Sequence, residues 1–297
     1  MKEVIRTPES RFENIKEYPF QSNYIQIQDN LIMHYLDEGN ANNPTILLLH
    51  GEPSWSYLYR HMIPILSKEF RVIAPDLIGF GKSDKLVSKE AYSYQAHLDW
   101  MTQFIEELDL KDMVLFCQDW GGLLGLRLVT QMSDRFSMVI ASNTALPTGQ
   151  PAMPESFLQW QHFSQTSEKF DIARVIDTGT VQKLSDHAYE AYNAPFPSEE
   201  YKAGARIFPT LVPTKEDDPE SLNNVKAWSK LRSWNKPFLT IFGSQDPIMF
   251  GVEKVFQKLI PGTQGQDHKI LHAGHFIQEE KGEELSELII EFYRKNS

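Results

Sequence analysis

The sequence is poor in cysteine and in long apolar stretches. Its 297 residues contain one cysteine, Cys117, which excludes an intrachain disulfide and a small fold held together by disulfides. Apolar runs such as Ile46–Leu49 are far shorter than the roughly 20 residues that a membrane-spanning helix needs. Residues 1–7 contain no apolar segment of the signal-peptide type. We therefore expect a cytoplasmic protein with no membrane partner.

Positive charge is also scarce. The 29 Lys and Arg residues are outnumbered by 40 Asp and Glu residues, which gives a net charge of −11, and no basic patch offsets it. An acidic chain repels the phosphates of nucleic acids, so we expect no nucleic-acid partner. Hydrophobic residues make up 41% of the chain and charged residues 23%. These fractions are typical of a globular protein and exclude a disordered one.

Short apolar segments alternate with amphipathic segments along most of the chain. The apolar ones have strand length and lie at residues 46–49, 72–74, 113–117, 138–141 and 238–242. Apolar residues at helical spacing occur between and after them, as at 98–108 and 285–292. This alternation predicts an α/β fold with a mostly parallel sheet. Residues 24–28 and 31–36 predict an antiparallel pair that turns at Asp29-Asn30.

The strand pattern stops between Pro147 and Trp234. Prolines and aromatic helical stretches such as 157–163 replace the buried strands there, and the strand pattern resumes at Phe238. We interpret this segment as an inserted, mostly helical module. The predicted organisation is a core of residues 1–146 and 235–297 with a helical cap of residues 147–234.

The segment around Asp119 carries the clearest chemical signal. It follows a predicted strand and precedes the helical pattern at 123–129, which is the strand–turn–helix arrangement of a nucleophile elbow. Serine usually occupies this place, but the chain has no Gly-x-Ser-x-Gly motif. A carboxylate needs no deprotonation at neutral pH and attacks carbon to form an ester. The chain order Asp119, Asp246, His275 matches the nucleophile–acid–base order of this architecture.

Two other patterns suggest sites that we reject. His272 and His275 have the spacing of a metal-binding pair, but no carboxylate or thiol set accompanies them. Residues 79–83 end in Gly-Lys-Ser like a phosphate-binding loop, but Asp76 stands where that motif needs its first glycine. A carboxylate there would repel phosphate. We therefore expect neither a metal ion nor a nucleotide.

At these motifs the chain resembles the haloalkane dehalogenases of the α/β-hydrolase fold. The resemblance extends from Arg6 to the final predicted helix, and the cap segments 157–160 and 208–209 match the subgroup with Glu after His-Gly and a late triad acid. It is carried by His-Gly-Glu-Pro at 50–53, by residues 75–84, by Gln-Asp-Trp-Gly-Gly at 118–122 and by Ala-Gly-His-Phe at 273–276. It implies a mostly parallel central sheet flanked by helices, with an inserted helical cap.

The resemblance also implies a reaction. Short haloalkanes and water would give an alcohol, a halide ion and a proton, with no metal or organic cofactor. Asp119 would displace the halide and form an alkyl ester, which water activated by His275 would hydrolyse. Asp246 would orient His275 and stabilise its charged form. The backbone N–H groups of Glu52 and Trp120 would form the oxyanion hole.

The departing halide needs weak hydrogen-bond donors in a dry pocket. An indole N–H is a donor only and sits on an apolar body, so Trp120 and Trp160 are the predicted halide-binding residues. The resemblance implies that those related enzymes with Asn in the place of Glu52 use it as the second donor. An ionised Glu52 would repel halide, so that donor must come from elsewhere. The family also leads us to expect a cis bond between Glu52 and Pro53.

The remaining site residues are assigned by position. Asn143 follows a strand where other subgroups place the triad acid, but an amide cannot serve there, which leaves Asp246. Apolar residues near the elbow and in the cap are candidates for the substrate pocket, although each is also an ordinary core residue. They are Leu123, Phe157, Phe208, Pro209, Val212, Ile248 and Met249.

Other functions use a similar elbow. An epoxide hydrolase must protonate an alkoxide and normally does so with two cap tyrosines, and Tyr189, Tyr192 and Tyr201 leave this alternative open. Indole N–H groups cannot protonate an alkoxide, so the tryptophans favour halide. Defluorination of haloacids would need a cationic neighbour, and no Arg adjoins Asp119 in the sequence. A third alternative is a catalytically inactive binding protein with this fold. The complete triad of Asp119, Asp246 and His275 argues against it, because a binding protein would not need all three residues.

The oligomeric state is a separate expectation. An enclosed site needs no second chain, so we expect a monomer.

Overall fold

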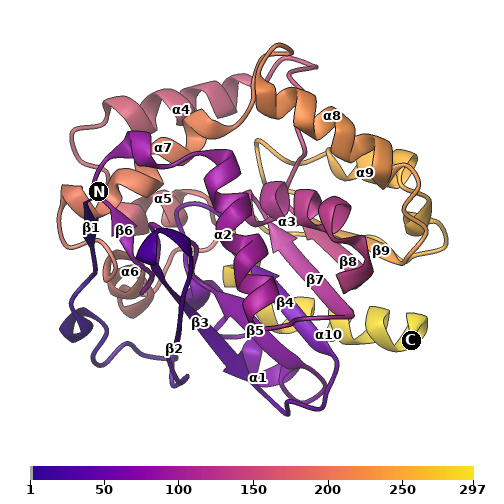
Figure 1. The fold of residues 1–297 in the computed structure, drawn as a ribbon, viewed down its shortest axis with the longest axis horizontal. Helices are drawn as coiled ribbons and strands as arrows, with labels where there is room; N and C mark the ends of the chain where they lie inside the picture. The colour runs from indigo at the N-terminus through magenta and orange to yellow at the C-terminus, as the bar shows by residue number, and fades with distance from the viewer. Residues whose placement is uncertain (1–2) are drawn as a thin grey trace.

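A twisted sheet lies between two layers of helices in the computed structural model, which describes residues 3–297 (Figure 1). Within that range the larger sheet has eight strands in the order β10-β9-β8-β7-β4-β5-β3-β2. Neighbouring strands are parallel from β10 to β5, whereas β3 is antiparallel to both β5 and β2. The strands are β2 (Asn23–Gln26), β3 (Ile32–Glu38), β4 (Thr45–Leu49), β5 (Arg71–Pro75), β7 (Met113–Gln118), β8 (Phe136–Ser142), β9 (Phe238–Gly243) and β10 (Lys269–Leu271). The predicted, mostly parallel sheet is confirmed.

The central strands are apolar on both faces. In β4, Leu47 and Leu49 belong to one buried cluster, and Ile46 and Leu48 belong to the cluster on the opposite face. This alternation is the period of two that a strand imposes on its side chains. Both faces of the sheet are therefore covered, as the continuous apolar runs in the sequence predict.

Helices from distant parts of the chain cover the two faces. One buried cluster includes side chains of α1 (Ile63–Leu66) and α10 (Ile277–Asn296). The other includes side chains of α2 (Tyr94–Glu107), α3 (Trp120–Gln131), α8 (Pro219–Leu231) and α9 (Glu253–Leu259). The helical patterns at 98–108 and 285–292 thus fall within α2 and α10. No helix among residues 3–297 has the length and apolar character that crossing a membrane requires.

The connections contain several short elements. The predicted turn at Asp29-Asn30 is a 3-10 turn in which both residues have positive φ, of 62° and 59°. β1 (Val4–Ile5) pairs antiparallel with β6 (Lys85–Leu86), and neither two-residue strand was predicted from the sequence. The 3-10 turns are η1 (Glu9–Arg11), η2 (Gln28–Asn30), η3 (Ser56–Tyr59), η4 (Lys89–Ala91), η5 (Ser133–Arg135), η6 (Glu199–Lys202) and η7 (Pro261–Thr263).

The segment between β8 and β9 is helical throughout its described elements. Its helices before α8 are α4 (Glu155–Thr166), α5 (Ile172–Thr178), α6 (Asp186–Asn193) and α7 (Ala203–Leu211). α4 packs against α7, and α5 packs against α6. They form a cap beyond one end of the sheet (Figure 1). α8 differs because it packs against α3, where Arg127 forms a 2.9 Å ion pair with Glu220.

Candidate active site

A sharp turn presents the Asp119 side chain at the end of β7. β7 ends at Gln118 and α3 begins at Trp120, so Asp119 alone makes the turn, with φ 51° and ψ −124°. A non-glycine residue in this region is strained, and such strain gathers at functional sites. A Cβ on Gly121 would overlap the Leu49 carbonyl oxygen. Glycine is therefore needed after Asp119 for the helix to start so close to β4.

A backbone donor contacts the Asp119 carboxylate, and a second follows it in the chain. The Glu52 N–H donates to Asp119 Oδ1 over 2.7 Å. Trp120 is the first residue of α3, where backbone N–H groups have no acceptor inside the helix. The two donors predicted for the oxyanion hole therefore lie beside the nucleophile. The Glu52–Pro53 bond is cis, as expected.

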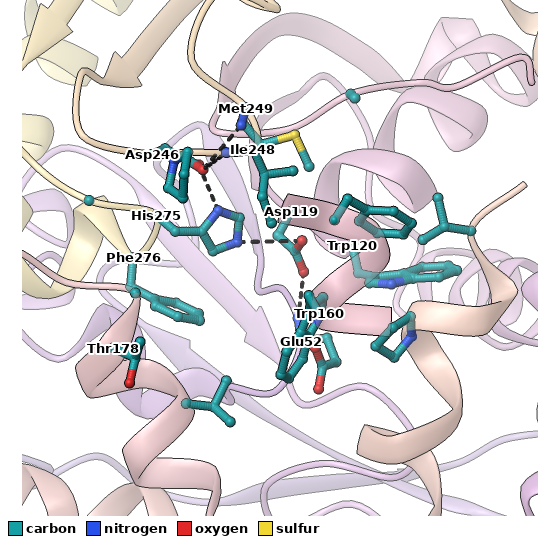
Figure 2. Close-up of a pocket in the computed structure, with 18 of the residues that line it drawn as sticks. Glu52, Asp119, Trp120, Trp160, Thr178, Asp246, Ile248, Met249, His275 and Phe276 are labelled. Carbon is teal, nitrogen blue, oxygen red and sulfur yellow. Dashed lines mark hydrogen bonds and ion pairs between the residues drawn. The ribbon is translucent and has the colours of Figure 1, made fainter. Parts of the chain in front are cut away.

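His275 connects the two aspartates predicted for the triad (Figure 2). His275 Nδ1 lies 2.7 Å from Asp246 Oδ2, and His275 Nε2 lies 3.5 Å from Asp119 Oδ2. The Asp246 side chain is fully buried. Its Oδ1 accepts hydrogen bonds from the backbone N–H groups of Ile248 and Met249 over 2.9 and 3.1 Å.

The charges of these groups depend on one another. Burial raises the pKa of Asp246, but His275, Asn143 and the backbone donors lower it more, to about 2. Burial lowers the pKa of His275, but the negative charges and hydrogen bonds of Asp246 and Asp119 raise it to about 10. At neutral pH an ionised His275 therefore lies between two carboxylates.

Two amides behind the triad were not predicted as supports. Asn143 Nδ2 donates to Asp246 Oδ2 over 2.7 Å, so the residue excluded as the acid instead holds the acid in place. Gln118 Nε2 donates to the His275 carbonyl over 3.1 Å and lies 3.0 Å from His275 Nε2. The sequence did contain a signal for these supporting roles. Gln118 ends β7 and Asn143 follows β8, and the carboxyl ends of parallel strands meet at one edge of a sheet, where the triad also lies.

An apolar cavity of about 250 Å³ opens above the Asp119 carboxylate. Six of the seven side chains predicted for the pocket line it: Leu123, Phe157, Pro209, Val212, Ile248 and Met249. The prediction for Phe208 is wrong, because this side chain is fully buried behind Trp120, with ring centroids 4.4 Å apart. Sequence reasoning missed other parts of the wall. They are the cap turn at 178–181, Ala145, Pro147, Met153, Val175, Gln245, Pro247, Gly274 and Phe276.

The two predicted halide donors both line this cavity, near Asp119 (Figure 2). Neither the Trp120 nor the Trp160 indole N–H has a protein acceptor among residues 3–297. By contrast, Trp55 and Trp228 donate to backbone carbonyls over 3.2 and 2.8 Å. A buried indole N–H usually has a partner, so two free ones in one cavity point to an acceptor supplied by a ligand.

Glu52 is a buried acidic residue in the wall of the cavity. Its side chain is buried and its Oε1 has no hydrogen-bond partner among the described residues. Burial, reinforced by the negative charge of Asp119, holds the pKa of Glu52 well above its usual range. The raised pKa favours the protonated form of Glu52, and its carboxyl group supplies no second halide donor in the place where related enzymes have Asn.

The other sequence-based alternatives can be located as well. Tyr189 donates to Asp171 over 2.7 Å and Tyr192 donates to Glu279 over 2.5 Å. Among the described residues no tyrosine lines the cavity, so the acidic O–H donors of an epoxide hydrolase are absent from it. His272 is exposed. Residues 3–297 contain no cluster of His, Cys, Asp and Glu suited to a metal ion.

Comparisons with known proteins agree with this geometry. A family model described as the alpha/beta hydrolase fold matches residues 44–282. A haloalkane dehalogenase of Psychrobacter cryohalolentis is 52% identical over 99% of both chains, and one of Mycolicibacterium paratuberculosis is 49% identical over 97% of both. Among solved structures, the tetrameric haloalkane dehalogenase DpaA of Paraglaciecola agarilytica superposes with a TM-score of 0.90. It is 37% identical, over 96% of this chain and 97% of its own.

Proposed function

This chain belongs to the haloalkane dehalogenases of the α/β-hydrolase fold, and from that membership we propose how its own residues break a carbon–halogen bond. The enzyme is a hydrolase that takes a small haloalkane and water as substrates. The observation that carries the proposal is the strained elbow that aims Asp119 into a cavity with two unpartnered indole N–H groups. Asp119 attacks the halogen-bearing carbon, and a covalent alkyl ester replaces the carbon–halogen bond.

Trp120 and Trp160 stabilise the halide as it leaves. Negative charge moves from the carboxylate to the halogen in this step, and preorganised donors in a dry cavity stabilise that charge. Both indole N–H groups can donate a hydrogen bond to the halide, because no described residue accepts one from them. The raised pKa of Glu52 favours its protonated form, which adds no negative charge that would oppose the halide.

His275 acts in the second step. The charge of Asp119 is one of the causes that raise the pKa of His275, and alkylation removes that charge. The pKa of His275 therefore falls once the ester has formed, so the imidazolium releases its proton to solvent and the neutral imidazole accepts a proton from water. The resulting hydroxide adds to the ester carbonyl carbon, while Asp246 stabilises the imidazolium and the Glu52 and Trp120 N–H groups stabilise the oxyanion. Collapse of this intermediate breaks the bond between the carbonyl carbon and the alkoxy oxygen. The imidazolium protonates the departing alkoxide to give the alcohol, and the carboxylic acid of Asp119 returns its proton to His275.

The chain division 1–146, 147–234 and 235–297 remains our proposal for core, cap and core. Within the cap segment α8 packs against the core helix α3. We therefore propose that any cap movement that admits substrate is confined to elements within residues 147–218 and leaves α8 in place.

Assembly and location are also proposals. The cavity is complete within one chain, which supports a monomer, although the relative DpaA is tetrameric. Light scattering on the purified protein distinguishes the two states. A cytoplasmic location is supported by the single cysteine, and fractionation of cells that express the full chain tests it.

Halide release provides the test of this function. Purified protein is incubated with 1-bromobutane and 1,2-dichloroethane, with styrene oxide in parallel and Asp119→Ala as the control. We expect halide release by the wild type alone and no opening of the epoxide. Epoxide opening without halide release would contradict the proposed roles of Trp120 and Trp160.

A further inference from the structure

Three segments meet behind His275. One is the loop 272–276 that carries His275, the second is the cap turn 179–182 between α5 and α6, and the third is the first turn of α10. The backbone N–H of His275 donates to the Gly179 carbonyl over 2.7 Å. The catalytic loop is therefore hydrogen-bonded directly to the cap.

Glu280 in the first turn of α10 bridges the other two segments. Its Oε1 accepts the backbone N–H groups of Val181 and Gln182 over 2.9 and 3.0 Å. Its Oε2 accepts the backbone N–H of Gly274 over 2.7 Å. One carboxylate thus receives three N–H groups, two from the cap turn and one from the residue before His275. Hydrogen bonds to an ionised acceptor are stronger than those between neutral groups.

The two backbones bridged by Glu280 are in close contact. A Cβ on Gly274 would overlap the Gly179 carbonyl oxygen, and a Cβ on Gly179 would lie 2.7 Å from the Phe276 ring. Neither segment can therefore shift toward the other. Gly179, Val181 and His275 also line the substrate cavity, so the turn held by Glu280 is a wall of the reaction site.

The neighbouring Glu279 fixes the turn from which Glu280 projects. Its carboxylate pairs with both Arg60 terminal nitrogens over 2.6 and 2.5 Å and accepts the Tyr192 hydroxyl over 2.5 Å. α10 is interrupted directly afterwards at Lys281, where φ is −134° and ψ is 25°. The turn of Glu279 and Glu280 is therefore held by its own contacts rather than by the rest of α10.

We propose that Glu280 is a positioning residue that couples the seating of the α5–α6 cap turn to the orientation of His275. The inference rests on the two-step function above and concerns its second step. Asp119 is held by the Glu52 N–H and by its own elbow, and Glu280 touches neither. Glu280 reaches Asp119 only indirectly, through the 3.5 Å contact of Asp119 with His275 and through the cavity wall. Hydrolysis of the ester uses His275 itself and therefore depends on Glu280 more strongly than alkylation does.

Glu280→Gln tests the proposal with little change of shape. The amide keeps one acceptor oxygen for the cap turn, but its NH₂ group faces the Gly274 N–H, where two donors cannot pair. The exposed Glu287 lies on the same helix, so Glu287→Gln removes one charge without touching the bridge and serves as the matched control. Glu280→Asp keeps the charge on a shorter side chain and replaces Glu280→Gln if that variant does not fold.

The experiment separates the two steps with 1-bromobutane. Rapid quenching measures bromide release in the first turnover, and intact mass follows the decay of the butyl-enzyme. We expect first-turnover bromide release within about twofold of wild type and decay of the butyl-enzyme slowed roughly tenfold to a hundredfold, the range that misplacement of a catalytic group produces. Glu287→Gln should match wild type in both rates.

The outcomes separate this proposal from the reaction itself. Equal slowing of both steps, slowing of bromide release alone, or no change in either rate would overturn the role of Glu280. Failure of the wild type to release bromide or to form a butyl-enzyme would instead overturn the two-step function. Slowed hydrolysis with unchanged bromide release supports the coupling of the cap turn to His275.

Discussion

The two halves of the active site are held by different forces. On the sheet side, hydrogen bonds from the backbone and from buried amides fix the triad, as with Asn143 on Asp246 and the Glu52 N–H on Asp119. On the cap side, Trp160 is half-buried and its described ring contacts are stacking ones, with Phe163 and Phe170 at 6.0 and 5.8 Å. Proton transfer and in-line attack need atoms fixed to a fraction of an ångström. A departing halide can be bound by a polarisable, adjustable wall.

The cap itself shows the same contrast. The α5–α6 turn is hydrogen-bonded to the loop of His275 and to Glu280. The α4 side, which carries Trp160, contacts the loop after Asp246 through a 3.0 Å hydrogen bond from Ser156 to the Pro247 carbonyl. Substrate entry and halide exit are therefore expected on the α4 side, because the α5–α6 side cannot open without moving the catalytic base.

The largest effect is expected from the sheet side. Asp119→Ala removes the nucleophile, and no neighbouring group replaces it, so halide release should fall by about 10⁴-fold or more. Initial rates with 1-bromobutane measure the loss, and thermal unfolding verifies the fold. Residual activity within tenfold of wild type would contradict the assignment of Asp119.

A smaller effect is expected from the cap side. Trp160→Phe keeps an aromatic wall but removes the N–H donor, and loss of one such donor costs about 10²-fold in the step it serves. Trp234→Phe is the matched control, because its buried indole N–H also has no partner among the described residues and Trp234 does not line the cavity. First-turnover halide release and bromide quenching of tryptophan fluorescence should change in Trp160→Phe only. Equal responses in both variants would remove Trp160 from the halide site.

The charge on His275 should appear in the dependence of stability on pH. Its pKa is raised from 6.5 to about 10 in the folded protein. The resulting contribution to stability is complete below pH 6.5 and is lost as the pH rises toward 10. The free energy of unfolding in urea should therefore fall more between these pH values in wild type than in His275→Phe. Parallel curves for the two proteins would contradict the ionised resting state.

The smallest effect is expected at Glu52. The raised pKa of Glu52 favours its protonated form. Glu52→Gln replaces that form with a neutral amide of similar shape, so bromide affinity should stay within about twofold of wild type. Fluorescence quenching by bromide at pH 7 measures it. Tighter binding by tenfold or more would show that Glu52 is ionised and opposes the halide.

The sheet side could be predicted from the sequence to a greater extent than the cap. Buried strands leave continuous apolar runs, and the polar residues after them, such as Asp119 and Asp246, identify themselves by position. The cap contains no such apolar strands followed by polar residues, so its site residues are not marked by position. Trp160 was identified through the resemblance to a family. Phe208 was predicted to line the pocket but packs behind Trp120, because a helical pattern shows which face of a helix is buried but not which residues pack against that face.

The remaining omissions have a common physical cause. The cap turn at 179–182 reaches the catalytic loop through backbone atoms, which are the same for every residue type, so Glu280 has no sequence signal of its role. The raised pKa of Glu52 depends on burial, which the sequence does not report directly. Asn143 was considered only as a replacement for the acid, whereas its contact with Asp246 depends on the register of β8 and β9.

The most direct test of the account is the intact mass of His275→Phe after incubation with 1-bromobutane. Alkylation needs only Asp119 and the halide donors, whereas hydrolysis needs the imidazole. The account predicts a stable increase in mass by one butyl group, located on the peptide that contains Asp119, and release of one bromide per protein molecule. An unmodified protein that nevertheless releases bromide, or a butyl group on another residue, would contradict the two-step mechanism.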